Sequence, residues 1–175
     1  SGKIGPAAFH RQIDVKVGAE VHISHNLIQE IRENRAYLVL NGSCYMFVEF
    51  PPDHVYPGVK NFFFDLMSEG IIPITAHPER NAVFARNPRL LYELIQMGAL
   101  TQVNSGSLTG LYGREAAEIV LRFLQWGLVH FIASDCHSPH SIPPRLLEAV
   151  KRAEAAIGKD EAQALVNSNP LAVLE

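Results

Sequence analysis

The 175-residue chain lacks three features that would each indicate a particular class of protein. No apolar run approaches the roughly 20 residues that a membrane-spanning helix needs, and the polar opening SGKIGPAAFHRQ has no apolar segment typical of a signal peptide. Clustered lysine and arginine are also absent, and the formal net charge is -3. Because nucleic-acid backbones are bound by clusters of basic residues, we expect no nucleic-acid partner. Without a membrane span or a signal peptide, we expect a cytoplasmic protein.

Cysteine is scarce as well, with only Cys44 and Cys136 in the chain. Two cysteines in a chain of this kind are more often free thiols than a disulfide. Hydrophobic residues make up 47% of the sequence and charged residues 19%, a balance that suffices for one buried core. We find no low-complexity stretch and no linker, so residues 1–175 are predicted to form a single domain.

Five apolar runs each end in a polar residue of a type that binds metal or phosphate. The runs are VKVGAE, MFVEF, IPITAH, LTQVNS and FIASDCH, and their polar ends are Glu20, Glu49, His77, Asn104, and Asp135 with His137. From Glu20 to Asp135 the successive spacings are 29, 28, 27 and 31 residues, close to the roughly 30 residues of one strand-plus-helix unit. This pattern predicts an α/β fold with a site at the carboxyl ends of its strands.

Helices are predicted between these strands from their start and stop signals. The segments 57–69, 87–98 and 114–127 each place apolar residues at helical spacing, and each is followed or closed by a glycine. Weaker signals predict a short helix capped by Ser24, then a hairpin or two strands in RAYLVLNG and YMFVEF around Asn41 and Gly42. The segment GSLTGLYG is predicted to be a loop that covers the site. Two final helices are predicted over 144–158 and 160–167.

The number of units bears on the type of α/β fold. Five units are fewer than the seven or eight that close a small barrel, so we expect the chain to lack the beginning of such a barrel. An open doubly wound sheet needs no closure and stays as the alternative.

The pair Asp135 and His137 is the first candidate for metal binding. Residues two apart in a strand face the same side, so the pair would form a two-point clamp; the alternative is an aspartate that caps a turn beside a surface histidine. The equivalent positions of Glu20, Glu49 and His77 favour a metal site, although Glu49 could also be the polar end of a strand that enters a proline loop. Oxygen and imidazole ligands without a thiolate suit Mn, Fe or Zn.

Arg80 follows His77 in the segment AHPER. An arginine so close to a metal ligand can bind phosphate oxygens in bidentate fashion, and the alternative is an ion pair with Glu79. The remaining histidines are not expected to be ligands: His22, His25, His54 and His140 are predicted at the surface or beside the site, and His130 is predicted to pack within a strand.

The motifs GAEVH, VEFP, AHPERN, QVNSGS and ASDCHS, in this order and spacing, resemble those of the bacterial polysaccharide-biosynthesis tyrosine phosphatases of the PHP (polymerase and histidinol phosphatase) superfamily. The resemblance implies a distorted (β/α)7 barrel, incomplete in this chain with about five units present, and up to three divalent metal ions, most often Mn. It implies metal binding by Glu20, Glu49, His77, Asp135 and His137, and phosphate contact by Arg80. Asp135 and a metal-bound water are the two candidate proton donors to the leaving phenolate, and the sequence does not decide between them.

The activity that the resemblance implies is removal of phosphate from phosphotyrosine on a bacterial tyrosine kinase that controls capsule or exopolysaccharide synthesis. The alternatives are another PHP phosphoesterase, of the histidinol-phosphate type, and an inactive fragment or binding module.

Two departures from the family pattern support these alternatives. The family opens with an H-x-H pair, whereas His10 stands alone here, and the arginine that tends to follow the family's D-x-H is absent, with Arg145 the nearest substitute. A chain without its first units should expose apolar surface, so a homo-oligomer is also predicted.

Overall fold

The computed structural model describes residues 14–24, 26–138 and 140–174. Its centre is a parallel sheet of five strands in chain order, with each strand hydrogen-bonded to the next. The strands are β1 (Glu20–His22), β2 (Tyr45–Glu49), β3 (Ile72–Ala76), β4 (Leu100–Asn104) and β5 (Phe131–Ala133).

The strand order decides between the two predicted architectures. A doubly wound sheet reverses its strand order at a switch point, and the order β1-β2-β3-β4-β5 contains no reversal. The doubly wound alternative is therefore wrong. Right-handed crossovers that all advance in one direction place their helices on one face of the sheet, as in a barrel. Within the described residues β1 and β5 are the two edges of the sheet, which agrees with a partial barrel of about five units.

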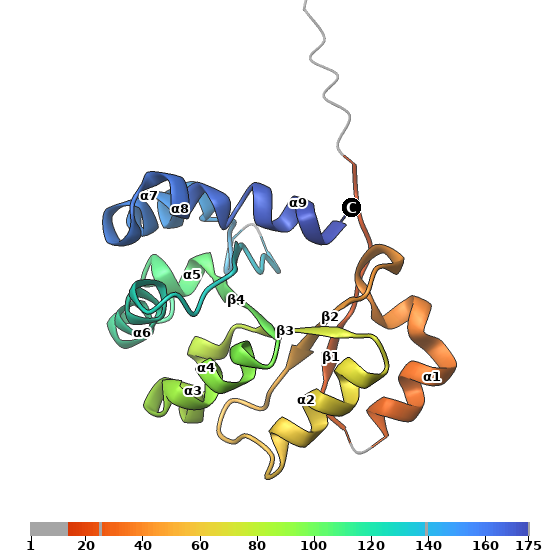
Figure 1. The fold of residues 1–175 in the computed structure, drawn as a ribbon. Coiled ribbons are helices and arrows are strands. Elements are labelled where there is room, and N and C mark those ends of the chain that lie inside the picture. Colours follow the sequence, from red (N-terminus) through yellow and green to blue (C-terminus); the bar gives the residue numbers. More distant parts are fainter. Residues whose placement is uncertain (1–13, 25, 139, 175) are drawn as a thin grey trace, which may run out of the picture.

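Nine α-helices and two 3-10 turns connect and follow the strands in the described part of the chain (Figure 1). They are α1 (Leu27–Leu38), η1 (Leu40–Gly42), α2 (Val59–Ser68), η2 (Pro78–Arg80), α3 (Ala82–Arg86), α4 (Pro88–Gln96), α5 (Ser105–Leu108), α6 (Arg114–Gln125), α7 (Leu146–Ile157), α8 (Lys159–Ala164) and α9 (Ser168–Leu174). None of these helices is long and apolar enough to cross a membrane.

The three helices with clear sequence signals are confirmed as α2, α4 and α6. Shortly after each helix comes a glycine with positive φ: Gly70 at 72°, Gly98 at 113° and Gly127 at 67°. Glycine adopts this left-handed conformation without the steric cost of a side chain, so the chain can turn at once into the next strand.

The region before β2 differs from its prediction. α1 begins at Leu27 after Asn26, so Ser24 is not its N-cap, and the helix continues to Leu38. RAYLVLNG is therefore mostly helical, so it forms neither a hairpin nor a strand beside YMFVEF, whose residues Tyr45–Glu49 form β2. Asn41 and Gly42 do form a turn, with φ of 48° and 71°. The apolar residues of this segment fitted a strand and one helix face equally well.

Three further segments also depart from expectation. The run VKVGAE does not form a strand that ends at Glu20, because β1 begins there. GSLTGLYG is not an open cover, since its residues Gly106–Leu108 belong to the buried helix α5 (Ser105–Leu108). The two predicted final helices are confirmed as α7 and α8, but the chain adds α9 after them.

The core lies mainly between the sheet and the helices on its outer face. Strand alternation in β2 directs Met46 and Val48 into this core, and helix residues such as Phe63 and Phe123 complete it. A smaller apolar cluster covers the opposite, inner face of the sheet, where Val173 of α9 packs on Ile74 and Phe131. The same alternation places Glu49 on the inner face.

The thiols and the exposed apolar residues complete this description. Cys44 and Cys136 are both free, as predicted. Val15 and Val17 are 77% and 78% exposed, which agrees with the expected apolar surface. The homo-oligomer and the single domain stay predictions.

Two adjacent phenylalanines of α2 provide a matched test of this packing. Phe63 is completely buried and Phe64 is 64% exposed. We predict that Phe63→Ala lowers the free energy of unfolding by about 3–5 kcal/mol, because it removes buried apolar surface and leaves a cavity. Phe64→Ala should change it by about 0.5 kcal/mol or less. Equal effects in urea unfolding curves would contradict the assignment of the core.

His130, just before β5, supplies a test that depends on pH. Its side chain is partly buried and its Nδ1 accepts a hydrogen bond of 3.2 Å from the Thr101 backbone N–H. Burial lowers the pKa of His130 below its ordinary value of 6.5. The unfolded chain then binds a proton more readily than the folded chain, so stability should fall as pH drops through 6.5 toward the folded pKa.

The measurement is an NMR titration of the His130 ring, with urea unfolding at several pH values beside it. A midpoint at or above 6.5 would contradict the predicted lowering.

Candidate metal and phosphate site

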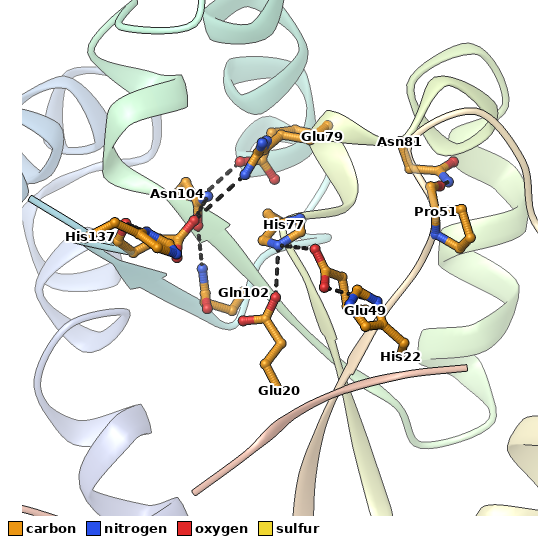
Figure 2. Close-up of polar contacts among 12 residues, drawn as sticks. Glu20, His22, Glu49, Pro51, His77, Glu79, Asn81, Gln102, Asn104 and His137 are labelled. Carbon is orange, nitrogen blue, oxygen red and sulfur yellow. Dashed lines mark hydrogen bonds and ion pairs between the residues drawn. The ribbon is translucent and has the colours of Figure 1, made fainter. Parts of the chain in front are cut away.

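Three predicted metal ligands from three neighbouring strands come together on the inner face of the sheet (Figure 2). Glu20 opens β1, Glu49 closes β2, and His77 directly follows β3. His77 Nε2 lies 2.9 Å from Glu20 Oε1 and 3.3 Å from Glu49 Oε1. One potential ligand atom from each residue lies within 4.8 Å of the others. The structure thus brings together three of the five residues predicted as ligands.

The charges in this cluster are unbalanced. The hydrogen bond from His77 lowers the pKa of the Glu20 carboxyl. Burial acts to lower the pKa of His77, but the hydrogen bond and charge of Glu20 outweigh it and raise the pKa. Even a protonated imidazole offers one positive charge against the two carboxylates of Glu20 and Glu49. A divalent cation in place of that proton would balance both carboxylates, and the oxygen and nitrogen donors fit Mn, Fe or Zn.

The backbone at this site is strained in two places. His77 and Asp135 have φ of 31° and 48°, in the left-handed region that non-glycine residues rarely adopt. Both residues lie just beyond the carboxyl end of a strand. Such conformations cost roughly 1–3 kcal/mol each and cluster at functional sites, which supports a functional role for this edge of the sheet.

Asp135 and His137 form a separate group. β5 ends at Ala133, so the strand alternation that predicted a clamp does not extend to them, and that reasoning is wrong. His137 Nδ1 instead lies 2.9 Å from the Asp135 backbone oxygen and 3.5 Å from its Oδ1. Metal binding by these two residues stays a prediction.

Arg80 lies beside Asp135. Its Nη1 is 3.7 Å from Asp135 Oδ2, and its guanidinium stacks over the Tyr112 ring at 5.0 Å. The alternative ion pair with Glu79 is wrong, because Glu79 is turned into the protein. Arg145 pairs with Glu148 at the start of α7, at 3.7 Å, and its role as a substitute for the family's second arginine stays a prediction. The half-exposed Arg80 is therefore positioned to meet a ligand at the edge of the sheet.

Asn104 connects Asp135 to the strand β4 through side-chain hydrogen bonds. Asn104 Nδ2 donates to Asp135 Oδ2 at 2.6 Å, and Gln102 Nε2 donates to Asn104 Oδ1 at 2.8 Å. The sequence spacing singled out Asn104, but its partner was not predicted. An amide held at both ends fixes the position of the aspartate carboxylate.

Glu79 is a site residue that the sequence reasoning missed. It is only 3% exposed, and its Oε1 accepts a 2.9 Å hydrogen bond from the Asn104 backbone N–H. Burial raises the pKa of Glu79, although the Asn104 amide opposes this effect. Its Oε2 has no hydrogen-bond partner among the described residues. The available signal was its place between His77 and Arg80.

Asn81 was also missed, and it joins two loops of the site. Its Oδ1 caps α3 by accepting from the N–H groups of Val83 and Phe84 at 2.9 and 3.0 Å. Its Nδ2 donates to the carbonyls of Pro51 and His54 at 2.6 and 2.9 Å. Asparagine is a preferred N-cap residue, so this role had a recognisable sequence signal.

The other histidines match their predicted positions where the structure describes them. His22 is exposed and its Nδ1 lies 3.1 Å from Glu49 Oε2, beside the candidate ligands. His54 is exposed and pairs with Asp53, and His140 is exposed. His10 and His25 lie outside the described residues.

The sheet and its cluster of two carboxylates and an imidazole define an α/β protein of the barrel type with a candidate divalent-metal site. Sequence comparison identifies the family within this class. Residues 6–175 match the family described as capsular polysaccharide synthesis, CpsB/CapC, and the chain belongs to this family.

Individual relatives carry names that indicate phosphatases. The chain is 41% identical over 126 residues to the tyrosine-protein phosphatase YwqE of Bacillus subtilis, and 39% identical over 126 residues to the putative tyrosine-protein phosphatase CapC of Staphylococcus aureus. Each match covers 72% of this chain and 49% of the relative. The chain thus spans about half the length of these two relatives. Identity to the tyrosine-protein phosphatase CpsB of Streptococcus pneumoniae is 29% over 165 residues, covering 91% of this chain and 68% of CpsB.

A solved structure confirms the fold. It comes from work on YwqE of Bacillus subtilis and CpsB of Streptococcus pneumoniae, described as unique metal-dependent tyrosine phosphatases. It matches with a TM-score of 0.84 and 37% identity, over 90% of this chain and 63% of the solved chain. The five-stranded parallel sheet is therefore consistent with the predicted PHP-type barrel.

Metal binding by the three-residue cluster can be tested directly. We predict that His77→Ala and Glu49→Gln each weaken Mn²⁺ binding more than about tenfold, since even the loss of a supporting residue costs 10-fold to 100-fold. Glu93→Gln is the control, because Glu93 pairs with Lys60 and Arg89 on the surface. Calorimetric titration gives the affinities, and circular dichroism checks the fold. Unchanged affinity in both site variants would contradict the assignment.

Proposed function

We propose that this chain carries the site of a metal-dependent phosphomonoester hydrolase, and that its substrate is phosphotyrosine in a protein. The observation that carries the proposal is the cluster of Glu20, Glu49 and His77, with Arg80 three residues after His77 and its Nη1 3.7 Å from Asp135 Oδ2. Carboxylate and imidazole ligands hold metal, and an arginine beside them binds phosphate. The names of the family's tyrosine phosphatases support this reading.

The turn η2 sets the distance between metal ligand and arginine. The Arg80 backbone N–H donates to the His77 carbonyl at 2.9 Å, so the two residues occupy one tight turn. A metal bound at Glu20, Glu49 and His77 would supply positive charge for the phosphate oxygens and would activate water. Arg80 would bind two phosphate oxygens through parallel N–H groups and stabilise the charge that develops during transfer.

Asp135 is the proposed proton donor. Asn104 holds its Oδ2, which leaves Oδ1 to carry the proton to the leaving phenolate. His137, 3.5 Å from this oxygen, is proposed with Asp135 as a ligand for a further metal ion. An oxygen that carries a proton cannot bind a metal ion at the same time. Oδ1 would therefore act either as proton donor or as metal ligand at any one moment.

We further propose Mn as the metal and a bacterial tyrosine kinase as the substrate. The kinase would control capsule or exopolysaccharide synthesis, and the reaction would take place in the cytoplasm. Membership in the capsular polysaccharide synthesis family supports this assignment.

Arg80 provides the test. We predict that Arg80→Ala lowers kcat/KM on a phosphotyrosine peptide between about 10-fold and 100-fold, since hydrogen bonds to charged groups contribute roughly 1.5–3 kcal/mol. The kcat/KM of Arg80→Lys should lie between those of the unchanged chain and Arg80→Ala, because lysine keeps the charge but not the bidentate geometry. Arg114→Ala is the control, since Arg114 is exposed and pairs with Glu118.

Release of inorganic phosphate from the Mn-loaded chain is the measurement. Unchanged kcat/KM in Arg80→Ala would exclude the phosphate-binding role. Hydrolysis of histidinol phosphate in preference to the peptide would favour the other PHP phosphoesterases, and no hydrolysis of either substrate would favour a binding module.

A further inference from the structure

A second cationic region lies beside Arg80, in a pocket of about 530 Å³. The pocket runs between α3 and α6, and Arg80 and Tyr112 line it together with Arg86 and Arg122. The chemistry described so far uses neither Arg86 nor Arg122.

These two arginines differ from their neighbours in how their charge is balanced. Among the described residues, neither Arg86 nor Arg122 forms an ion pair, and Arg122 donates only to the Glu118 carbonyl at 3.4 Å. By contrast Arg89 and Arg114 bind carboxylates four residues away, at 3.1 and 2.7 Å.

The carboxylates in the pocket leave this charge available. Glu79 also lines it, but Glu79 is buried and bound to the Asn104 amide. Glu115 is the other carboxylate of the lining, so three arginines meet two glutamates, of which Glu79 is buried.

The dimensions of the pocket fit an extended peptide. Glu115, Ile119 and Arg122 line it from one face of α6, because residues three and four apart lie on the same side of a helix. At 1.5 Å per residue, the seven positions from Glu115 to Arg122 span about 10 Å. An extended chain covers that distance in about three residues. The lining also includes Ala82, Ala85 and Ala116, whose small side chains leave room for a peptide backbone.

We propose that this pocket is a subsite for acidic residues that flank the phosphotyrosine of the substrate. With the phosphate at Arg80, a glutamate or aspartate two to four positions away would reach Arg86 and Arg122, which line the same pocket. Charge-assisted hydrogen bonds to these two arginines then select acidic substrates. The inference rests on the proposed function, since it takes the position of the phosphotyrosine from the role of Arg80.

The test compares two fluorescent phosphotyrosine peptides that differ only in having glutamate or glutamine at the positions two to four residues on either side. Binding is measured by anisotropy with metal chelated, so that the phosphate is not removed. The net charge of the chain is -3, so general attraction does not favour the acidic peptide and a preference has to be local.

We expect the acidic peptide to bind about tenfold more tightly, which is the lower end for hydrogen bonds to charged groups. The double variant Arg86→Gln/Arg122→Gln should reduce the preference below about threefold. Arg89→Gln removes the same kind of charge from α4, outside the pocket, and should keep the full preference.

Equal affinity for the two peptides in the unchanged chain, or no binding of either, would overturn the subsite. A preference that the double variant retains would also overturn it. Phosphate release by the Mn-loaded chain separates the two proposals. Preferential binding through Arg86 and Arg122 without phosphate release would leave the subsite in place and remove the phosphatase. Phosphate release from both peptides at equal rates, with equal binding of the two, would support the phosphatase and remove the subsite.

Discussion

Two carboxylates that face one buried imidazole are the constraint on which the site depends. Glu20 and Glu49 approach the same nitrogen of His77, and a single proton there cannot neutralise both charges. Removing carboxylates from water costs free energy unless a cation or hydrogen bonds replace the water. The parallel order of β1, β2 and β3 creates this convergence, because it places the inner-face residues of three strands at one edge. A divalent cation would balance these charges with the carboxylate and imidazole groups that the chain provides.

The short turn η2 connects this cluster to the rest of the site. His77 lies before it and faces the two carboxylates, while Glu79 binds the backbone of β4 at Asn104. Arg80 leaves the turn on the exposed side and reaches Asp135 beyond β5. One turn therefore fixes the spacing of the proposed metal ligand His77, the buried Glu79 and the proposed phosphate-binding Arg80. The positive φ of His77 is the backbone cost of this arrangement.

Charge also changes sign across the surface around the site. Carboxylates surround the proposed metal position, whereas Arg80, Arg86 and Arg122 line the neighbouring pocket. A phosphate is attracted to both regions, since it binds metal and arginine alike. An acidic peptide segment is attracted only to the second, so the same surface can orient a peptide as well as bind its phosphate.

The sequence by itself determined the features that depend on local chemistry. Glycines beyond α2, α4 and α6 specify the turns into the next strands. The regular spacing of Glu20, Glu49 and His77 predicted a shared site, although Glu20 opens β1 and does not close it. Asn41 and Gly42 likewise predicted a turn. The segment RAYLVLNG was misread because a short apolar run fits either a strand or one helix face.

Tertiary structure alone decided the contacts between distant segments. The hydrogen bond from Asn104 to Glu79 and the approach of α6 to α3 join residues whose local sequence carries no trace of the partner. The positions of Asp135 and His137 were decided in the same way, since β5 ends before them and the backbone there no longer follows strand geometry. Spacing can place a side chain at the end of a strand, but only packing fixes which neighbour it meets.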